Sequence, residues 1–148
     1  MRDRPKYMAV QGAALLVGGA LIALGVLGFI PGVTTDYDRL DWTVPQSAAK
    51  VFGLFVTSGA HNVVHVAIGI LGLVMAHSYA AARAYFLGGG LAYLALWAHG
   101  LIIDHGTWLH FALGVTMVIL ALTLAGQHDP TKRRRRVRSS RAHGGEVA

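Results

Sequence analysis

The residues best suited to chemistry in this 148-residue chain are its histidines. Imidazole is a good ligand for zinc, copper, iron and nickel, and two facing imidazoles can hold a haem iron from both sides. Three of the eight histidines lie at a similar depth, about 4–6 Å from the ends of apolar segments if these are helical. The candidate ligands are therefore His65, His99 and His110, with His61, Asp104 and His105 beside them as additions.

The same histidines also have a structural interpretation. His65 follows Asn62 by three residues, and His110 follows Thr107 by three. Asn and Thr are favoured helix N-caps, and a polar side chain three residues later can bond back to the cap. Neutral imidazole accepts with one nitrogen and donates with the other. We expect caps and interhelical hydrogen bonds at these positions, with a metal or haem site as the first alternative and proton handling as the second.

Most enzymatic chemistry is excluded by what the chain lacks. There is no cysteine, hence no disulfide, thiolate metal site or cysteine nucleophile. The G-x-S-x-G signature of serine hydrolases is missing. The predicted spans hold no Asp, Glu, Lys or Arg, although pumps and ion-coupled carriers place such groups within the membrane. We therefore expect neither catalysis nor a resident cofactor.

The elements that carry these residues are predicted from long uncharged stretches. Hydrophobic residues make up 54% of the chain and charged residues 14%, against about 25% in soluble domains. The stretches are close to the roughly 20 residues of a transmembrane helix and lack the alternation of strands. We predict an all-α integral membrane four-helix bundle with spans at about 8–30, 62–80, 84–103 and 107–126, an outer loop over 31–61, a basic segment over 1–7 and a disordered basic tail over 127–148. Within the outer loop, residues 51–61 are expected to form an interfacial or short helical entry.

The distribution of basic residues predicts the orientation. Three basic residues precede the first span, Arg83 lies between the second and third spans, and seven lie between residues 132 and 141. The opposite side has only Arg39 and Lys50. Because basic flanks stay in the cytoplasm, both termini are predicted to be cytoplasmic. The basic tail is expected to contact anionic lipid; nucleic acid is not an expected partner, since no aromatic residues are interleaved with the basic run.

Two segments of the chain resemble each other. Residues 62–69 read N-V-V-H-V-A-I-G and residues 107–114 read T-W-L-H-F-A-L-G, while residues 18–21 loosely match residues 88–91. This pattern favours two parallel two-helix repeats. Small residues let helix backbones approach closely in lipid. The predicted contact points are Gly18, Gly25, Gly69, Gly72, Gly89 and Gly114.

Several of these motifs resemble a known family. They are L-G-F-I-P-G-V-T-T over residues 27–35, the segment 51–73 with H-N-x-x-H, the segment 82–102, and W-L-H-F-A-L-G over residues 108–114. They resemble the small bacterial four-span membrane proteins of domain-of-unknown-function family 4383, over about residues 8–126. One departure is Thr107, where the family often has Asn. The resemblance implies the four-span architecture and no activity.

We therefore expect a multi-pass protein of the bacterial cytoplasmic membrane. Its predicted role is that of a structural or accessory subunit without catalysis, which packs against further copies of itself or against another membrane protein. The first alternative is a metal- or haem-binding membrane protein that uses the histidine layer, and the second is a passive channel or carrier subunit.

Overall fold

The computed structural model describes residues 8–42, 48–102 and 108–124 of the chain. The predicted basic segment over 1–7, the tail over 127–148, and Thr107, Asp104 and His105 lie outside these residues. The described part is mostly helical and contains four α-helices, as predicted. The elements in chain order are α1 (Ala9–Leu27), β1 (Thr34–Thr35), the 3-10 turn η1 (Tyr37–Arg39), β2 (Lys50–Val51), β3 (Phe55–Val56), α2 (Gly59–Met75), α3 (Tyr79–Ile102) and α4 (Trp108–Leu124).

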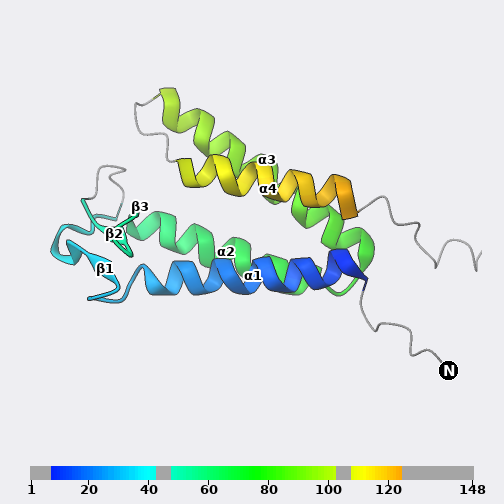
Figure 1. Cartoon of the computed structure of the whole chain (residues 1–148), viewed down its shortest axis with the longest axis horizontal. Helices are drawn as coiled ribbons and strands as arrows, with labels where there is room; N and C mark the ends of the chain where they lie inside the picture. Colours follow the sequence, from blue (N-terminus) through cyan, green and yellow to red (C-terminus); the bar gives the residue numbers. More distant parts are fainter. Residues whose placement is uncertain (1–7, 43–47, 103–107, 125–148) are drawn as a thin grey trace, which may run out of the picture.

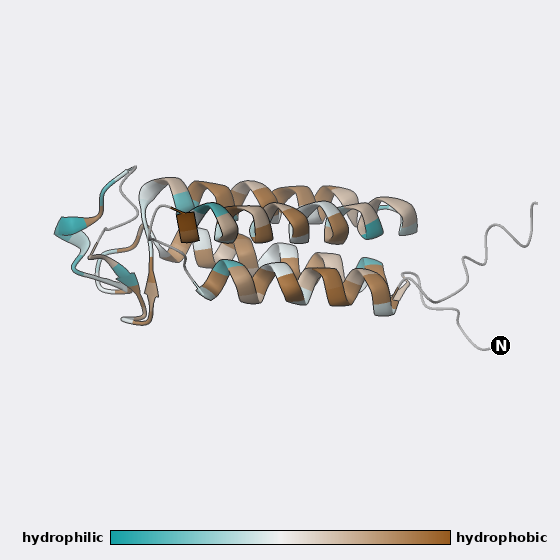
Figure 2. Ribbon diagram, turned by 90° about the horizontal axis from the view of Figure 1, so that it is seen from above, coloured by the Kyte–Doolittle hydropathy of each residue, from teal (hydrophilic) through white to brown (hydrophobic). Residues whose placement is uncertain are grey.

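The helices pack as two pairs, α1 with α2 and α3 with α4 (Figure 1). Seen from above, all four lie along the same long axis (Figure 2). The small sheet and the starts of α2 and α4 lie at one end of the bundle, which we call the sheet end (Figure 1). The start of α1, the α2–α3 turn and the end of α4 lie at the opposite end (Figure 1). Successive helices are therefore antiparallel, with a long connection over residues 28–58 between α1 and α2 and a short turn between α2 and α3.

Glycines bring the backbones of α1 and α2 into contact. A Cβ atom on Gly69 would lie 2.6 Å from the carbonyl oxygen of Gly18, and one on Gly18 would lie 2.8 Å from the oxygen of Gly69. Neither distance leaves room for a side chain, so the close approach depends on glycine at both positions. All six predicted contact glycines lie against another helix, and the structure adds Gly90 as a further helix contact. Gly28 and Gly59 are also tightly packed, but against the side chains of Asn62 and Trp42.

The second helix pair repeats this contact. Gly90 of α3 and Gly114 of α4 face each other, and a Cβ on either would lie 3.0 Å from the carbonyl oxygen of the other. The neighbours match too, because Ile22 and Leu94 each lie four residues after the glycine of the first helix in their pair. Gly18 therefore corresponds to Gly90 in the repeat. The predicted match of residues 18–21 to residues 88–91 is wrong by two positions.

The start of α2 differs from the prediction. The helix begins at Gly59, and its N-cap is Ser58, whose Oγ accepts a hydrogen bond from His61 N (3.3 Å). Asn62, the predicted cap, is instead a buried residue of the helix, and its Oδ1 accepts a hydrogen bond from Thr57 Oγ1. Ser and Asn are both good caps, and the apolar pattern could not choose between them. The predicted boundaries of span two, 62–80, are corrected accordingly.

The start of α3 is also earlier than predicted. The helix begins at Tyr79, five residues before the predicted start at Ala84, and so includes Arg83, which is exposed. Ser78 Oγ accepts a hydrogen bond from Ala81 N (3.2 Å) in the first turn. The charge of Arg83 was used as a boundary, but a long basic side chain can lie within the first turns of a helix and extend toward water.

The segment between α1 and α2 contains a small sheet where a helical entry was predicted. Strands β1, β2 and β3 pair in that order, both pairs antiparallel. Phe52 and Gly53 have φ values of 54° and 69°, so the chain reverses through left-handed backbone between β2 and β3. A helix cannot include two such residues. The prediction of a short helix over 51–61 is therefore wrong up to Ser58, and α2 covers only its last residues.

Candidate functional site: a buried histidine–tyrosine cluster

Four polar aromatic side chains meet inside the bundle near its sheet end. They come from three helices, and they are His61 and His65 of α2, Tyr93 of α3 and His110 of α4. His65, Tyr93 and His110 are 4%, 0% and 5% exposed. We call these four residues the His–Tyr cluster. It links the two helix pairs through polar groups in an interior that is otherwise mainly apolar.

The central contact of the cluster is a hydrogen bond between His65 Nδ1 and Tyr93 Oη (2.8 Å). It joins α2 to α3, and therefore one helix pair to the other. The ring of His110 stacks on Tyr93, with centroids 5.8 Å apart and planes 26° apart, and its centroid is 6.0 Å from that of His65. The expectation of an interhelical hydrogen bond is thus confirmed for His65. The same residue does not cap a helix.

The predicted capping role belongs to His61. His61 Nδ1 lies 2.9 Å from Ser58 Oγ, and the backbone N–H of His61 donates to the same hydroxyl. The Ser58 hydroxyl thus caps the helix and also bonds the His61 ring; unlike the N3 side chain of a capping box, the ring reaches the hydroxyl and not the backbone N–H of the cap. The His61 ring also lies beside that of His110, with centroids 4.8 Å and planes 47° apart. His61 therefore connects the helix cap to the buried cluster.

The structure brings together two of the three predicted metal ligands, His65 and His110, and adds His61. His99 is exposed on α3, and no ring contact joins it to the cluster. Asp104 and His105 lie outside the described residues. Among the residues that the structure describes, no group of three or more His, Cys, Asp or Glu side chains could hold a metal ion. Three imidazoles are thus neighbours without converging on one point.

Tyr93 and Ser58 are the members of the site that the sequence analysis did not assign. Tyr93 was one of few hydroxyl-bearing residues inside an apolar span, and this was the available signal. A buried phenol needs a hydrogen-bond partner, and a histidine on another helix was the natural candidate. Ser58 directly precedes G-A-H. A serine three positions before a polar side chain is a pattern typical of a helix N-terminus, and it indicates Ser58 as the cap.

These features define a small helical protein with two candidate membrane helices and a hydrogen-bonded polar cluster between its helix pairs. Helices α1 and α3 are long and apolar enough to cross a membrane, whereas α2 and α4 are shorter apolar helices of 17 residues. The chain belongs to the family described as a domain of unknown function, DUF4383, which matches residues 11–123. This confirms the resemblance noted from its motifs. No curated protein and no solved structure matches the chain.

Proposed function

We propose that this protein is a four-span integral protein of the bacterial cytoplasmic membrane. The observation that carries the proposal is the distribution of side chains, which reverses that of a soluble bundle. Every helix exposes large apolar residues, for example Leu16 of α1, Val74 of α2 and Leu122 of α4, which are 77%, 61% and 62% exposed. Polar side chains such as Gln11 and Asn62 are buried instead. Only a lipid environment removes so much apolar helix surface from water without a partner on every face.

The lengths of the helices support the same proposal. Helices α2 and α4 have 17 residues each, or about 26 Å at 1.5 Å per residue. This is the lower end of what crosses a hydrocarbon core of about 30 Å. Within the four helices the only Lys, Arg, Asp or Glu is Arg83, near the start of α3. The loop at the sheet end has only two basic residues, Arg39 and Lys50, against Arg83 and ten basic residues in the two terminal segments. The positive-inside rule therefore favours a sheet end outside the cell and an α2–α3 turn in the cytoplasm.

The topology can be tested with single cysteines, because the natural chain has none. Leu54, in the turn before β3, is 68% exposed, and His77, in the α2–α3 turn, is also exposed. In intact spheroplasts, a membrane-impermeant maleimide should label Leu54→Cys, whereas His77→Cys should react only after lysis. The cysteine-free parent is the control for background labelling. Equal labelling of both variants in spheroplasts, or the reverse pattern, would contradict the proposed topology.

Within the membrane, the proposed role is that of a structural or accessory subunit without catalysis. The support is that several buried polar groups are bonded within the bundle: Tyr93 to His65, Ser58 to His61, and Gln11 Nε2 to the carbonyl of Ala76 (2.9 Å). A site built for substrate would present such groups to a cavity. The exposed apolar faces fit lipid, a second copy of the chain or another membrane protein, and the basic tail fits anionic lipid.

Metal or haem binding is the second candidate, and one observation favours it. Hydroxyl groups occupy Nδ1 of both His61 and His65, an arrangement that in metal sites fixes the ring and leaves Nε2 for the ion. The two rings, together with His110, would have to rotate before they could share an ion. A metal there would be a structural or sensing centre.

An optical spectrum and elemental analysis of the detergent-purified protein decide between the two candidates. We expect no Soret band and no stoichiometric metal, because hydroxyl groups already satisfy the ring nitrogens that hold the cluster together. The His65→Ala/His110→Ala variant should then differ only in being less stable. About one metal per chain, or a haem spectrum, that disappears in this variant would establish the cofactor site and refute the purely structural role.

A further inference from the structure

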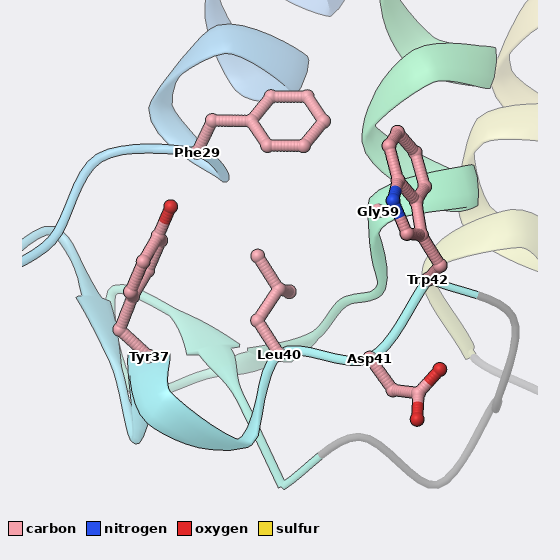
Figure 3. A pocket seen from close by; sticks show the side chains of 6 residues that line it. All are labelled: Phe29, Tyr37, Leu40, Asp41, Trp42 and Gly59. Atoms are coloured by element: carbon pink, nitrogen blue, oxygen red, sulfur yellow. The ribbon is translucent and has the colours of Figure 1, made fainter.

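A second feature of the molecule, separate from the His–Tyr cluster, is a pocket at the sheet end. Its volume is about 240 Å³, which is below the roughly 300–1,000 Å³ of pockets for drug-sized ligands. Its walls come from the end of α1, the η1 segment and the first residue of α2 (Figure 3). The lining residues are Phe29, Tyr37, Leu40, Asp41, Trp42 and Gly59.

The wall that carries Trp42 is held firmly against α2. Gly59 N donates to the carbonyl oxygen of Asp41 (2.9 Å), and Ala60 N donates to that of Trp42 (3.0 Å). These are N–H groups of the first turn of α2, which have no partner within the helix. The indole lies directly over Gly59, where a Cβ atom would collide with it. The pocket is therefore formed in advance and does not require a ligand to assemble it.

The aromatic side chains of the pocket surround its open volume. Phe29 and Trp42 meet edge to face, with centroids 6.3 Å apart and planes 64° apart. The hydroxyl end of Tyr37 points toward Phe29 from the other side, and Leu40 lies between the rings (Figure 3). Trp42 remains 63% exposed, so the pocket is open to solvent. A small ligand could enter without any movement of the helices.

The chemistry of the lining selects the kind of ligand. Three aromatic rings and one phenol hydroxyl line the pocket, and none of the six lining residues is basic. The backbone of Asp41 borders the pocket, while its carboxylate points away from the rings (Figure 3). The faces of aromatic rings attract cations. The adjoining described loop, residues 33–42, has three Asp and one Arg. Its net negative charge also favours a positively charged ligand. An anion would meet no positive charge in this lining. A cation with an apolar surface fits both the aromatic rings and the negative charge of the loop.

We propose that this pocket binds a small organic ammonium group, of the size of choline. The group is either a free amine or the headgroup of a membrane lipid, since the end of α1 places the pocket next to the proposed membrane surface. The inference goes beyond the proposed membrane role. Its central test, in detergent, does not depend on the topology.

The test uses the fluorescence of Trp42. The chain has three tryptophans, and Trp97→Phe/Trp108→Phe leaves Trp42 as the only one. This full-length variant is titrated with choline in amine-free buffer and a sugar-headgroup detergent. A saturable change of emission, with a Kd on the order of 1 mM, is expected for so small a ligand. The neutral isostere 3,3-dimethylbutan-1-ol should produce no saturable change. An equal response to both compounds would overturn the proposal, because shape alone would then explain binding.

Further substitutions locate the site. In the same single-tryptophan background, Phe29→Leu should weaken choline binding about 2- to 30-fold, the range expected for loss of one cation–π contact. The matched control is Phe55→Leu, which removes a ring that packs against position 108 and does not line the pocket, and it should leave the affinity unchanged. Asp41→Asn removes one negative charge beside the pocket and keeps its aromatic lining, so it should weaken binding less than Phe29→Leu does. Equal affinities in all four proteins would overturn the assignment.

Vesicles distinguish the two sources of the ammonium group. The single-tryptophan protein is reconstituted in phosphatidylglycerol with or without phosphatidylcholine. A change of Trp42 emission with phosphatidylcholine, reversed by Phe29→Leu, would identify a lipid headgroup. A response to free choline alone would identify a soluble amine. No response of Trp42 to either form would refute the proposal, even if the topology experiment succeeds.

Discussion

Replacing Gly69 by alanine should lower the free energy of unfolding by about 2–3 kcal/mol, the upper part of the range for overpacked sites. The new Cβ would lie 2.6 Å from Gly18 O, 2.8 Å from Ile22 N and 2.7 Å from Ile22 Cγ1. Two of these atoms belong to the backbone of α1, so no rotamer change relieves the contact. The helices would have to separate, and the packing around them would loosen. Reversible unfolding in mixed detergent micelles measures the effect.

The matched controls are glycines in the same kind of helix with open space around them. No atom outside the local helix lies within 4 Å of a Cβ placed on Gly19 or Gly88. Gly19→Ala and Gly88→Ala should therefore leave stability unchanged or raise it by up to about 1 kcal/mol, the usual gain from glycine to alanine in a helix. Gly114→Ala should be intermediate, because its shortest contacts are to the side chain of Leu94. Similar values for Gly69→Ala and Gly19→Ala would show that α1 and α2 do not pack as described.

Removing the Tyr93 hydroxyl is expected to be the second large effect. Tyr93→Phe leaves His65 Nδ1 without its partner in a buried site, and an unsatisfied buried group costs about 1–3 kcal/mol. The same substitution at Tyr85 is the control. Tyr85 is also buried on α3, but its hydroxyl has no hydrogen-bond partner in the described structure. Tyr85→Phe should therefore be neutral or stabilising.

A double-mutant cycle isolates the bond itself. His65→Ala and Tyr93→Phe should be non-additive by about 0.5–3 kcal/mol, whereas His65→Ala and Tyr85→Phe should be additive to within about 0.5 kcal/mol. The measurement is the same unfolding titration. If Tyr93→Phe costs no more than Tyr85→Phe, the hydrogen bond does not hold the two helix pairs together, and the structural role of the His–Tyr cluster would be refuted.

Local patterns along the chain were sufficient for the number of helices and for the glycine contacts. Uncharged runs limited by Pro31 and by charged segments indicated four helices, because a helix needs a continuous run of compatible residues. The repeated H-x-x-x-G identified Gly69 and Gly114 as equivalent positions, and both make the predicted backbone contact. The pairing of His65 with His110 inside the bundle follows from the same repeat.

Other features depended on how the helices are rotated and where the loop folds back. His99 and Tyr93 lie on the same helix, but only Tyr93 faces α2, because six residues along a helix lead to a different side. Ser58 became the cap of α2 in place of Asn62 because the loop positions Thr57 and Gly28 around Asn62.

The sequence by itself thus determined the number of helices and six of the glycines at which they meet, since runs of apolar and small residues can be recognised from residues close together in the chain. The tertiary structure alone decided the hydrogen-bond partners of His61 and His65, the small three-stranded sheet and the aromatic pocket. Phe29 and Gly59 are far apart in sequence, and only packing of the loop between α1 and α2 brings them to one site.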